Sequence, residues 1–152
     1  MRRLGMVFVC VVVLGLAAFA QSGGRMAADE VIAITKAQWA AEMRKDVAGA
    51  MKNVADYYTE FNEDYLTRLD GRGINVRLAE AQNGASGSMV AAEMTNEKVQ
   101  VYGDVAILTY NFAGVVKDKD GKTETNRAKS TRVFIKKDGQ WWLVHANFGK
   151  AD

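Results

Sequence analysis

The last third of the chain, residues 97–148, reads EKVQVYGDVAILTYNFAGVVKDKDGKTETNRAKSTRVFIKKDGQWWLVHANF. Apolar and β-branched runs alternate there with turn sequences at Gly103-Asp104, Asp120-Gly121 and Asp138-Gly139. Asp-Gly between such runs is the strongest short-range signal for a β-hairpin. The stretch therefore predicts four strands joined by tight turns as an antiparallel meander.

The turns also predict the register of the strands, and the register decides which side chains share a face. Two-residue loops at the three turns pair Lys98 with Thr109, Thr109 with Arg132, and Arg132 with His145. Because side chains alternate along a strand, one face is expected to be mixed in polarity and the other almost wholly apolar. The mixed face would hold Lys98, Ile107, Thr109, Asn111, Ser130, Arg132, Phe134, Trp141, Leu143, His145 and Asn147, and the apolar face Val99, Val101, Leu108, Tyr110, Phe112, Val133, Ile135, Trp142, Val144 and Phe148.

The residues before this meander predict a mostly helical half. Apolar residues recur at helical spacing from Asp29 to about Lys45, and Asp46 is expected to start a second, short helix that ends near Ala55. The run 57–61 is aromatic and β-branched and predicts a strand, and a third helix is expected over 74–82. With a further strand opening at Met89, segregated helices and an antiparallel sheet predict an α+β fold.

The first 20 residues have the pattern of a secretory signal peptide. Two arginines precede an apolar run that ends in Ala18-Phe19-Ala20, a small-residue cleavage sequence. The run is shorter than the roughly 20 residues that a spanning helix needs, which favours cleavage near Ala20 over a membrane anchor. The sequence thus predicts a signal peptide (1–20), a flexible leader (21–28) and one domain (29–152) in a periplasmic or secreted protein.

Composition excludes several classes of function for the mature chain. Cleavage would remove Arg2 and Arg3 and no acid, so the 20 basic residues fall to 18 and equal the 18 acidic ones. A neutral chain without a basic cluster is not expected to bind nucleic acid or a membrane surface. Cys10 is the single cysteine and leaves with the signal peptide, which excludes a disulfide scaffold and a cysteine nucleophile. With one histidine in the chain, we expect no metal site and no cofactor.

The meander also resembles a known superfamily. The sequences VYGDVA (101–106), TRVF (131–134) and KDGQWWLVHAN (137–147) are similar to those of SnoaL-like proteins in the nuclear transport factor 2-like superfamily. They are also similar to the association domain of calcium/calmodulin-dependent kinase II. The resemblance covers roughly residues 29–149 and implies a cystatin-like cone, in which a curved mixed or antiparallel sheet wraps around the N-terminal helices.

The resemblance further implies a pocket at the open end of the cone and assembly through the outer sheet face. By analogy with the kinase domain, Arg132 would point into the pocket, which places the mixed face inside and the apolar face between subunits. The expected pocket residues are Arg132, His145, Asn111, Thr109, Asn147, Tyr58, Glu60, Trp39, Phe134 and Trp141, with Tyr57 and Phe61 also in the cone. The expected dimer interface consists of Val133, Ile135, Trp142, Val144, Tyr110 and Phe112.

The chemistry of the expected pocket leaves alternatives open. Arg132 would either clamp a ligand carboxylate or form a structural ion pair with an acid such as Glu60 or Asp64. His145 would either act as an acid–base group or tie the sheet to the helices. Many relatives have His-x-His where this chain has His145-Ala146-Asn147, so a two-histidine site is not expected.

The function predicted from the sequence is binding of a small organic molecule, with a carboxylate or carbonyl group, by an exported homodimer or larger homo-oligomer. One alternative is an isomerase, cyclase or dehydratase that transfers protons in the same pocket, like ketosteroid isomerase or a polyketide cyclase. A carboxylate among Asp56, Glu60 and Asp64 would then be the proton carrier, although none aligns with a catalytic residue. The other alternative is an assembly module without a ligand.

Overall fold

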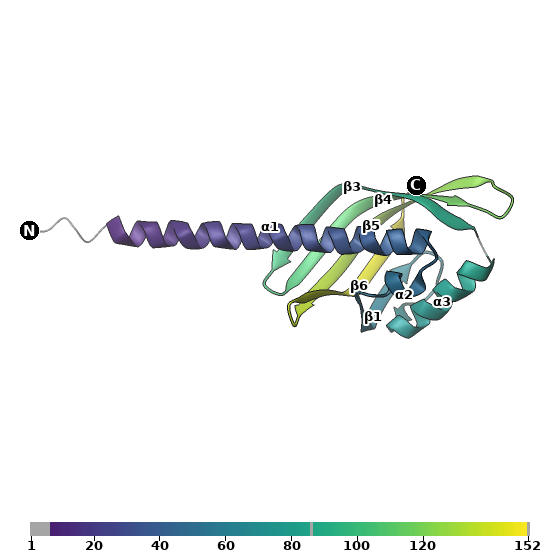
Figure 1. Cartoon of the computed structure of the whole chain (residues 1–152), viewed down its shortest axis with the longest axis horizontal. Coiled ribbons are helices and arrows are strands. Elements are labelled where there is room, and N and C mark those ends of the chain that lie inside the picture. The colour runs from purple at the N-terminus through teal and green to yellow at the C-terminus, as the bar shows by residue number, and fades with distance from the viewer. Residues whose placement is uncertain (1–6, 86, 152) are drawn as a thin grey trace, which may run out of the picture.

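The chain folds as one mixed sheet with helices against one of its faces, in the computed structural model, which describes residues 7–85 and 87–151 (Figure 1). This α+β architecture, with a curved and unclosed sheet, is the predicted fold class. The elements in chain order are α1 (Val7–Met43), α2 (Val47–Ala50), β1 (Val54–Asn62), β2 (Leu69–Asp70), α3 (Arg72–Ala85), β3 (Ser88–Tyr102), β4 (Val105–Lys117), β5 (Thr123–Lys137) and β6 (Gln140–Lys150).

Helix α1 is longer than the sequence predicted and α2 is shorter. Asp29 lies inside α1 rather than at its start, and the helix includes residues 21–28, for which a flexible leader was expected. The N-terminal half of α1 projects beyond the rest of the chain (Figure 1). Asp46 caps α2 as predicted by accepting a hydrogen bond from Gly49 N at 2.8 Å. In the described residues, no helix is both long and apolar enough to cross a membrane.

The sheet contains six strands in the order β2-β1-β6-β5-β4-β3. Strands β3 to β6 form the predicted antiparallel meander. Strand β1 joins it by pairing parallel to β6, with Thr59 opposite His145, and β2 pairs antiparallel to β1. Strands β1 and β2, from the first half of the chain, therefore complete the sheet that the closing hairpins begin.

At two of the three predicted turns, the strands that flank the turn pair in the predicted register. Lys98 pairs with Thr109 across the β3–β4 turn, and Lys137 pairs with Gln140 across Asp138-Gly139. Asp138 and Gly139 both have positive φ, 54° and 77°, as a two-residue hairpin loop of this kind requires. The local turn signal was sufficient at both places.

The β4–β5 register differs by one residue from the predicted one. The loop contains five residues, 118–122, and Lys117 pairs with Thr123. Asp118 stabilises this wider turn because its Oδ1 accepts hydrogen bonds from the amides of Asp120 (2.9 Å) and Lys122 (2.8 Å). A shift of one residue exchanges the two faces of a strand, so Thr109 pairs with Thr131 rather than with Arg132.

A β-bulge changes the register a second time, within β5–β6. Phe134 pairs with Leu143 as predicted, but Val133 pairs with His145, which leaves Val144 as an extra residue in β6. Arg132 therefore lies opposite Ala146 and not opposite His145. The bulge moves His145 and Asn147 to the outer face and brings Phe148 to the inner one.

These two register changes correct the predicted faces. The inner face, which packs on α1, is apolar except around Arg132 and Ser130, and the outer face is the mixed one. The inner residues are Val99, Val101, Ala106, Leu108, Tyr110, Phe112, Ser130, Arg132, Phe134, Trp141, Leu143, Ala146 and Phe148. Tyr110 and Phe112, expected in the dimer interface, are thus inside the fold, where Tyr110 is 4% exposed.

Neighbouring residues Tyr110 and Asn111 test this register because they occupy opposite faces of β4. Tyr110→Ala should lower the free energy of unfolding by about 3–5 kcal/mol, as removal of a buried aromatic ring does. Asn111→Ala should cost less than about 1 kcal/mol, because it removes a half-buried amide with one exposed hydrogen bond. Urea unfolding of both variants measures the difference. A larger loss for Asn111→Ala would support the register predicted from two-residue loops.

Candidate functional site

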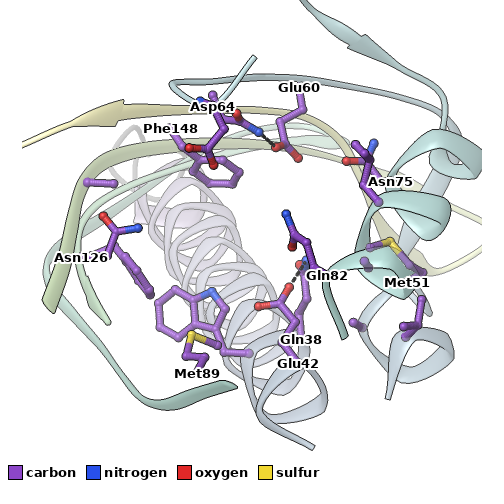
Figure 2. Close-up of a pocket in the computed structure, with 18 of the residues that line it drawn as sticks. Gln38, Glu42, Met51, Glu60, Asp64, Asn75, Gln82, Met89, Asn126 and Phe148 are labelled. Carbon is purple, nitrogen blue, oxygen red and sulfur yellow. Dashed lines mark hydrogen bonds between the residues drawn. The ribbon is translucent and has the colours of Figure 1, made fainter. Parts of the chain in front are cut away.

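A cavity of about 540 Å³ opens between the inner face of the sheet and the three helices. Four of the residues predicted for the pocket line it: Trp39 from α1, Tyr58 and Glu60 from β1, and Arg132 from β5. Figure 2 shows Glu60 and Asp64 directed into the cavity from one side and Glu42 from the opposite side. The polar residues of the cavity therefore come from strands and helices far apart in the sequence.

Six other residues predicted for the pocket lie elsewhere. Phe134 and Trp141 are buried in the core but do not line the cavity. Thr109, Asn111 and Asn147 lie with Lys129 along a shallow groove that is separate from this cavity, because the register of β4 and of the end of β6 turns their side chains outward.

His145 is also on the outer side of the sheet. Its Nδ1 shares a hydrogen bond of 2.8 Å with the Thr59 hydroxyl, and its ring meets Phe61 edge-on at 6.3 Å. Phe61 and Tyr57, expected in the cone, are 47% and 63% exposed. The histidine therefore ties β6 to the neighbouring strand β1, neither reaching the helices as its predicted structural role required nor lying in position for chemistry in the cavity.

Arg132 is a buried guanidinium without a carboxylate partner. It is 4% exposed, and its Nε donates to the Tyr110 hydroxyl at 2.8 Å while its Nη1 donates to Gln38 Oε1 at 2.7 Å. The Phe148 ring lies 5.1 Å from the guanidinium carbon. No described carboxylate oxygen lies within 4 Å of it, so the predicted ion pair with Glu60 or Asp64 does not form.

The hydrogen-bonding capacity of Arg132 is only partly used. A guanidinium has five N–H donors, and two of them have an acceptor among the described residues. Burial lowers the pKa of Arg132, but Tyr110, Tyr58 and Glu42 together raise it by more than burial lowers it. The pKa is therefore above its ordinary value, and the group is charged at any physiological pH. A buried charge with unused donors is a site where an anionic ligand gains strong hydrogen bonds.

Ser130 provides a second unused polar group beside Arg132. The two residues share the inner face of β5, and Ser130 is 4% exposed and also lines the cavity. Its hydroxyl is the one buried side-chain polar atom without a hydrogen-bond partner in the described part of the chain. Buried polar groups are nearly always paired, so this hydroxyl is consistent with a site that a ligand completes.

Gln38 connects Arg132 to a half-buried acid. Its Oε1 accepts from Arg132, and its Nε2 donates to Glu42 Oε1 at 3.0 Å, one helical turn further along α1. Burial raises the pKa of Glu42, and the charge of Glu60 adds to this effect, while Arg132 and the bond from Gln38 partly offset it. The cavity thus contains a carboxyl group that is easier to protonate than an exposed glutamate.

Glu60 is held in place by two neutral donors. The Tyr58 hydroxyl donates to Glu60 Oε2 at 2.7 Å, and Asn62 Nδ2 donates to Glu60 Oε1. Burial and the negative charge of Glu60 both raise the pKa of Tyr58, so its phenol remains protonated and available as this donor. The carboxylate is therefore oriented by hydrogen bonds but is not neutralised by a cation.

An aromatic wall forms the apolar side of the cavity. Trp39 meets Tyr110 and Phe112 edge-on, with ring centroids 5.7 Å and 5.2 Å apart, and Phe148 continues the wall toward Arg132. Apolar walls around a few convergent polar groups are typical of small-molecule sites. In the described residues, no group of three or more histidine, cysteine, aspartate or glutamate side chains could hold a metal ion.

Several residues of the site were not predicted. Tyr110, Phe112 and Phe148 were assigned to the wrong face through the register, and Ser130 was placed on the correct face but not in the pocket. Gln38 and Glu42 lie four residues apart in the first helix, which puts both on one side of it. That spacing was visible in the sequence, but nothing in the sequence shows which side of the helix faces Arg132.

Comparisons with known proteins agree with this architecture. The association domain of the Caenorhabditis elegans calcium/calmodulin-dependent kinase II is 21% identical over 84% of this chain and 98% of its own, with a TM-score of 0.71. A putative association domain from Xanthomonas campestris is 18% identical over 80% and 86%, with a TM-score of 0.71. A nuclear transport factor 2-like protein from Salmonella enterica serovar Typhimurium is 14% identical over 84% and 94%, with a TM-score of 0.74.

A search of curated proteins gave no match. The model of the calcium/calmodulin-dependent protein kinase II association domain family matches residues 27–149, which include every described residue of the cavity. The inner face, residues 27–43 of α1 and the hairpin sequences are all within this match. The chain therefore belongs to the calcium/calmodulin-dependent protein kinase II association domain family, on a nuclear transport factor 2-like fold.

Proposed function

We propose that this protein binds a small organic carboxylate in the cavity, after export, as a homodimer or larger homo-oligomer. The observation that carries the proposal is the pair of buried, incompletely bonded groups on β5. Arg132 has unused donors, and the Ser130 hydroxyl has no partner among the described residues. A carboxylate accepts bidentate hydrogen bonds from a guanidinium and would satisfy groups that otherwise reduce the stability of the fold.

The outer sheet face supports the proposal of self-assembly. Val133, Ile135 and Trp142 are half-buried there, and Val105 and Tyr102 beside them are 36% and 60% exposed. The described helices pack on the other face, so no described part of the chain covers this apolar end of the sheet. Solved relatives are described as association domains and hubs, which supports a second copy of the chain as the cover.

A panel of small carboxylates and matched neutral amides tests the ligand. The carboxylates should stabilise the wild-type domain in a thermal-shift assay, and the amides should not, because only a carboxylate pairs with the buried guanidinium. Arg132→Met should abolish the response. Arg127→Met, on the same strand but exposed, is the matched control and should respond like the wild type. Equal stabilisation of wild type and Arg132→Met would show that carboxylates bind elsewhere.

Trp142→Glu tests the outer face as an interface. A carboxylate in the apolar end of this face cannot be buried between subunits without a large cost, so light scattering should report monomers. Lys117→Glu, at the end of the β4–β5 hairpin, should keep the wild-type mass. A Trp142→Glu variant that folds and keeps the wild-type assembly would remove this face from the proposed interface.

Glu42 supports a second candidate, an enzyme that transfers a proton within the same cavity. A carboxyl group with a raised pKa, linked through Gln38 to a buried guanidinium, is suited to exchange a proton with a bound carbonyl compound. Ketosteroid isomerase-like and polyketide cyclase-like reactions use a pocket acid in this way. This candidate predicts that deuterium from the solvent exchanges into the position next to a carbonyl of a bound compound. Glu42→Gln should lower the rate of this exchange.

The pH dependence of stability tests the ionisation of Glu42 directly. Because its pKa is raised in the folded state, the protonated carboxyl favours folding at low pH, and this contribution is lost as pH rises through the folded pKa. Glu42→Gln cannot ionise and should therefore melt at a higher temperature than the wild type at pH 8, with the difference shrinking toward pH 4. A wild type that is more stable than Glu42→Gln at pH 8 would mean that the effect of Arg132 on the pKa of Glu42 outweighs the effect of burial.

A further inference from the structure

The charges around the cavity do not suit a simple carboxylate alone. Its lining contains one deep cation, Arg132, and one cation at the mouth, Lys45, whose Nζ donates to the Asn83 carbonyl at 3.3 Å. The same lining contains five carboxylates: Glu42, Asp46, Glu60, Glu63 and Asp64. Acids thus outnumber bases, and a ligand that carried only negative charge would be attracted by Arg132 and repelled by most of the remaining cavity.

Four of these carboxylates lack a cationic partner. No lysine or arginine nitrogen in the described part of the chain lies within 4 Å of Glu42, Glu60, Glu63 or Asp64, since the four ion pairs there involve other acids. Among the described residues, Glu60 accepts hydrogen bonds only from the neutral groups of Tyr58 and Asn62. The side chains of Glu60 and Asp64 are both directed into the cavity, on the side that faces Glu42 (Figure 2).

We propose that the ligand is a zwitterion, whose carboxylate binds Arg132 and Ser130 and whose ammonium group binds between Glu60 and Asp64. Such a ligand pairs the buried cation and the unpaired acids of one cavity at the same time. This inference rests on the proposed carboxylate site and adds the second, cationic end of the ligand.

The part of the cavity between the carboxylate and ammonium sites determines which shape of ligand fits between them. The aromatic wall of Trp39, Tyr110, Phe112 and Phe148 borders the cavity beside Arg132, so a flat or extended apolar body fits there. An organic ammonium ion is also a better partner for these acids than a metal ion. The described acids do not form a group that could hold a metal, and an ammonium needs only one or two oxygens at hydrogen-bond distance.

The test uses pairs of compounds that differ only in the amine. The probes are 4-(aminomethyl)benzoate against 4-methylbenzoate, and 5-aminopentanoate and 6-aminohexanoate against pentanoate and hexanoate. Isothermal titration at pH 7 should give at least tenfold tighter binding for the amino compound of one or more pairs. Equal or tighter binding of the compounds without the amine would overturn the zwitterion and leave the carboxylate site intact.

Charge-removing variants locate the ammonium end. Glu60→Gln and Asp64→Asn keep the shape of each side chain and should each reduce the affinity for the amino compounds about tenfold, while the affinity for the plain carboxylates stays unchanged or rises. Glu80→Gln, exposed on α3 and not part of the cavity lining, is the matched control and should change neither. An unchanged preference for the amino compounds in both cavity variants would overturn the assignment of Glu60 and Asp64.

The experiments give a different result if the carboxylate site itself is wrong. If no compound in either series binds the wild type, or if Arg132→Met binds all of them as the wild type does, the carboxylate site and the zwitterion are both wrong. Loss of all binding in Arg132→Met, together with selective loss of the amino compounds in Glu60→Gln, supports both. The two variants therefore separate the proposed function from the inference that extends it.

Discussion

Side chains alternate across a sheet, so one residue more or less in a strand or turn decides which groups enter the cavity. The five-residue turn around Asp118 fixes β4 so that Tyr110 faces inward, where its hydroxyl accepts from Arg132 at 2.8 Å. The bulge at Val144 then brings Phe148 inward beneath the same guanidinium and turns His145 away. The surroundings of Arg132 therefore depend on these two local irregularities, and the polar chemistry of the cavity depends on Arg132.

The buried guanidinium organises the polar groups around it through neutral partners. Tyr110 and Gln38 accept its hydrogen bonds, and Gln38 in turn donates to Glu42, so this acid is linked to Arg132 without an ion pair. Glu60 is likewise oriented by Tyr58 and Asn62 and not by a cation. A cavity that keeps opposite charges apart in this way leaves both available to a ligand, at some cost to the stability of the empty protein.

The sequence predicted the order of the elements and the antiparallel meander because these follow from local signals. Asp138-Gly139 sets its hairpin by positive φ, and Asp46 caps its helix through one side-chain hydrogen bond. The site was harder to predict because it depends on register. Asp120-Gly121 resembles a two-residue turn, but the side chain of Asp118 stabilises a wider one, and no sequence pattern marks Val144 as a bulge. Each error exchanged the faces of a strand, which placed Thr109, Asn111, His145 and Asn147 inside and Tyr110, Phe112 and Phe148 outside.

The central claim is that the guanidinium of Arg132 is an open binding group inside the cavity. The most direct measurement is the nitrogen NMR spectrum of the arginine side chains, with the Arg132 signals identified by their loss in Arg132→Lys. Addition of 4-(aminomethyl)benzoate should shift the Arg132 Nη signals and leave the Nε signal, which is bonded to Tyr110, nearly unchanged. Saturable binding of the same compound with no change at Arg132 would contradict the account.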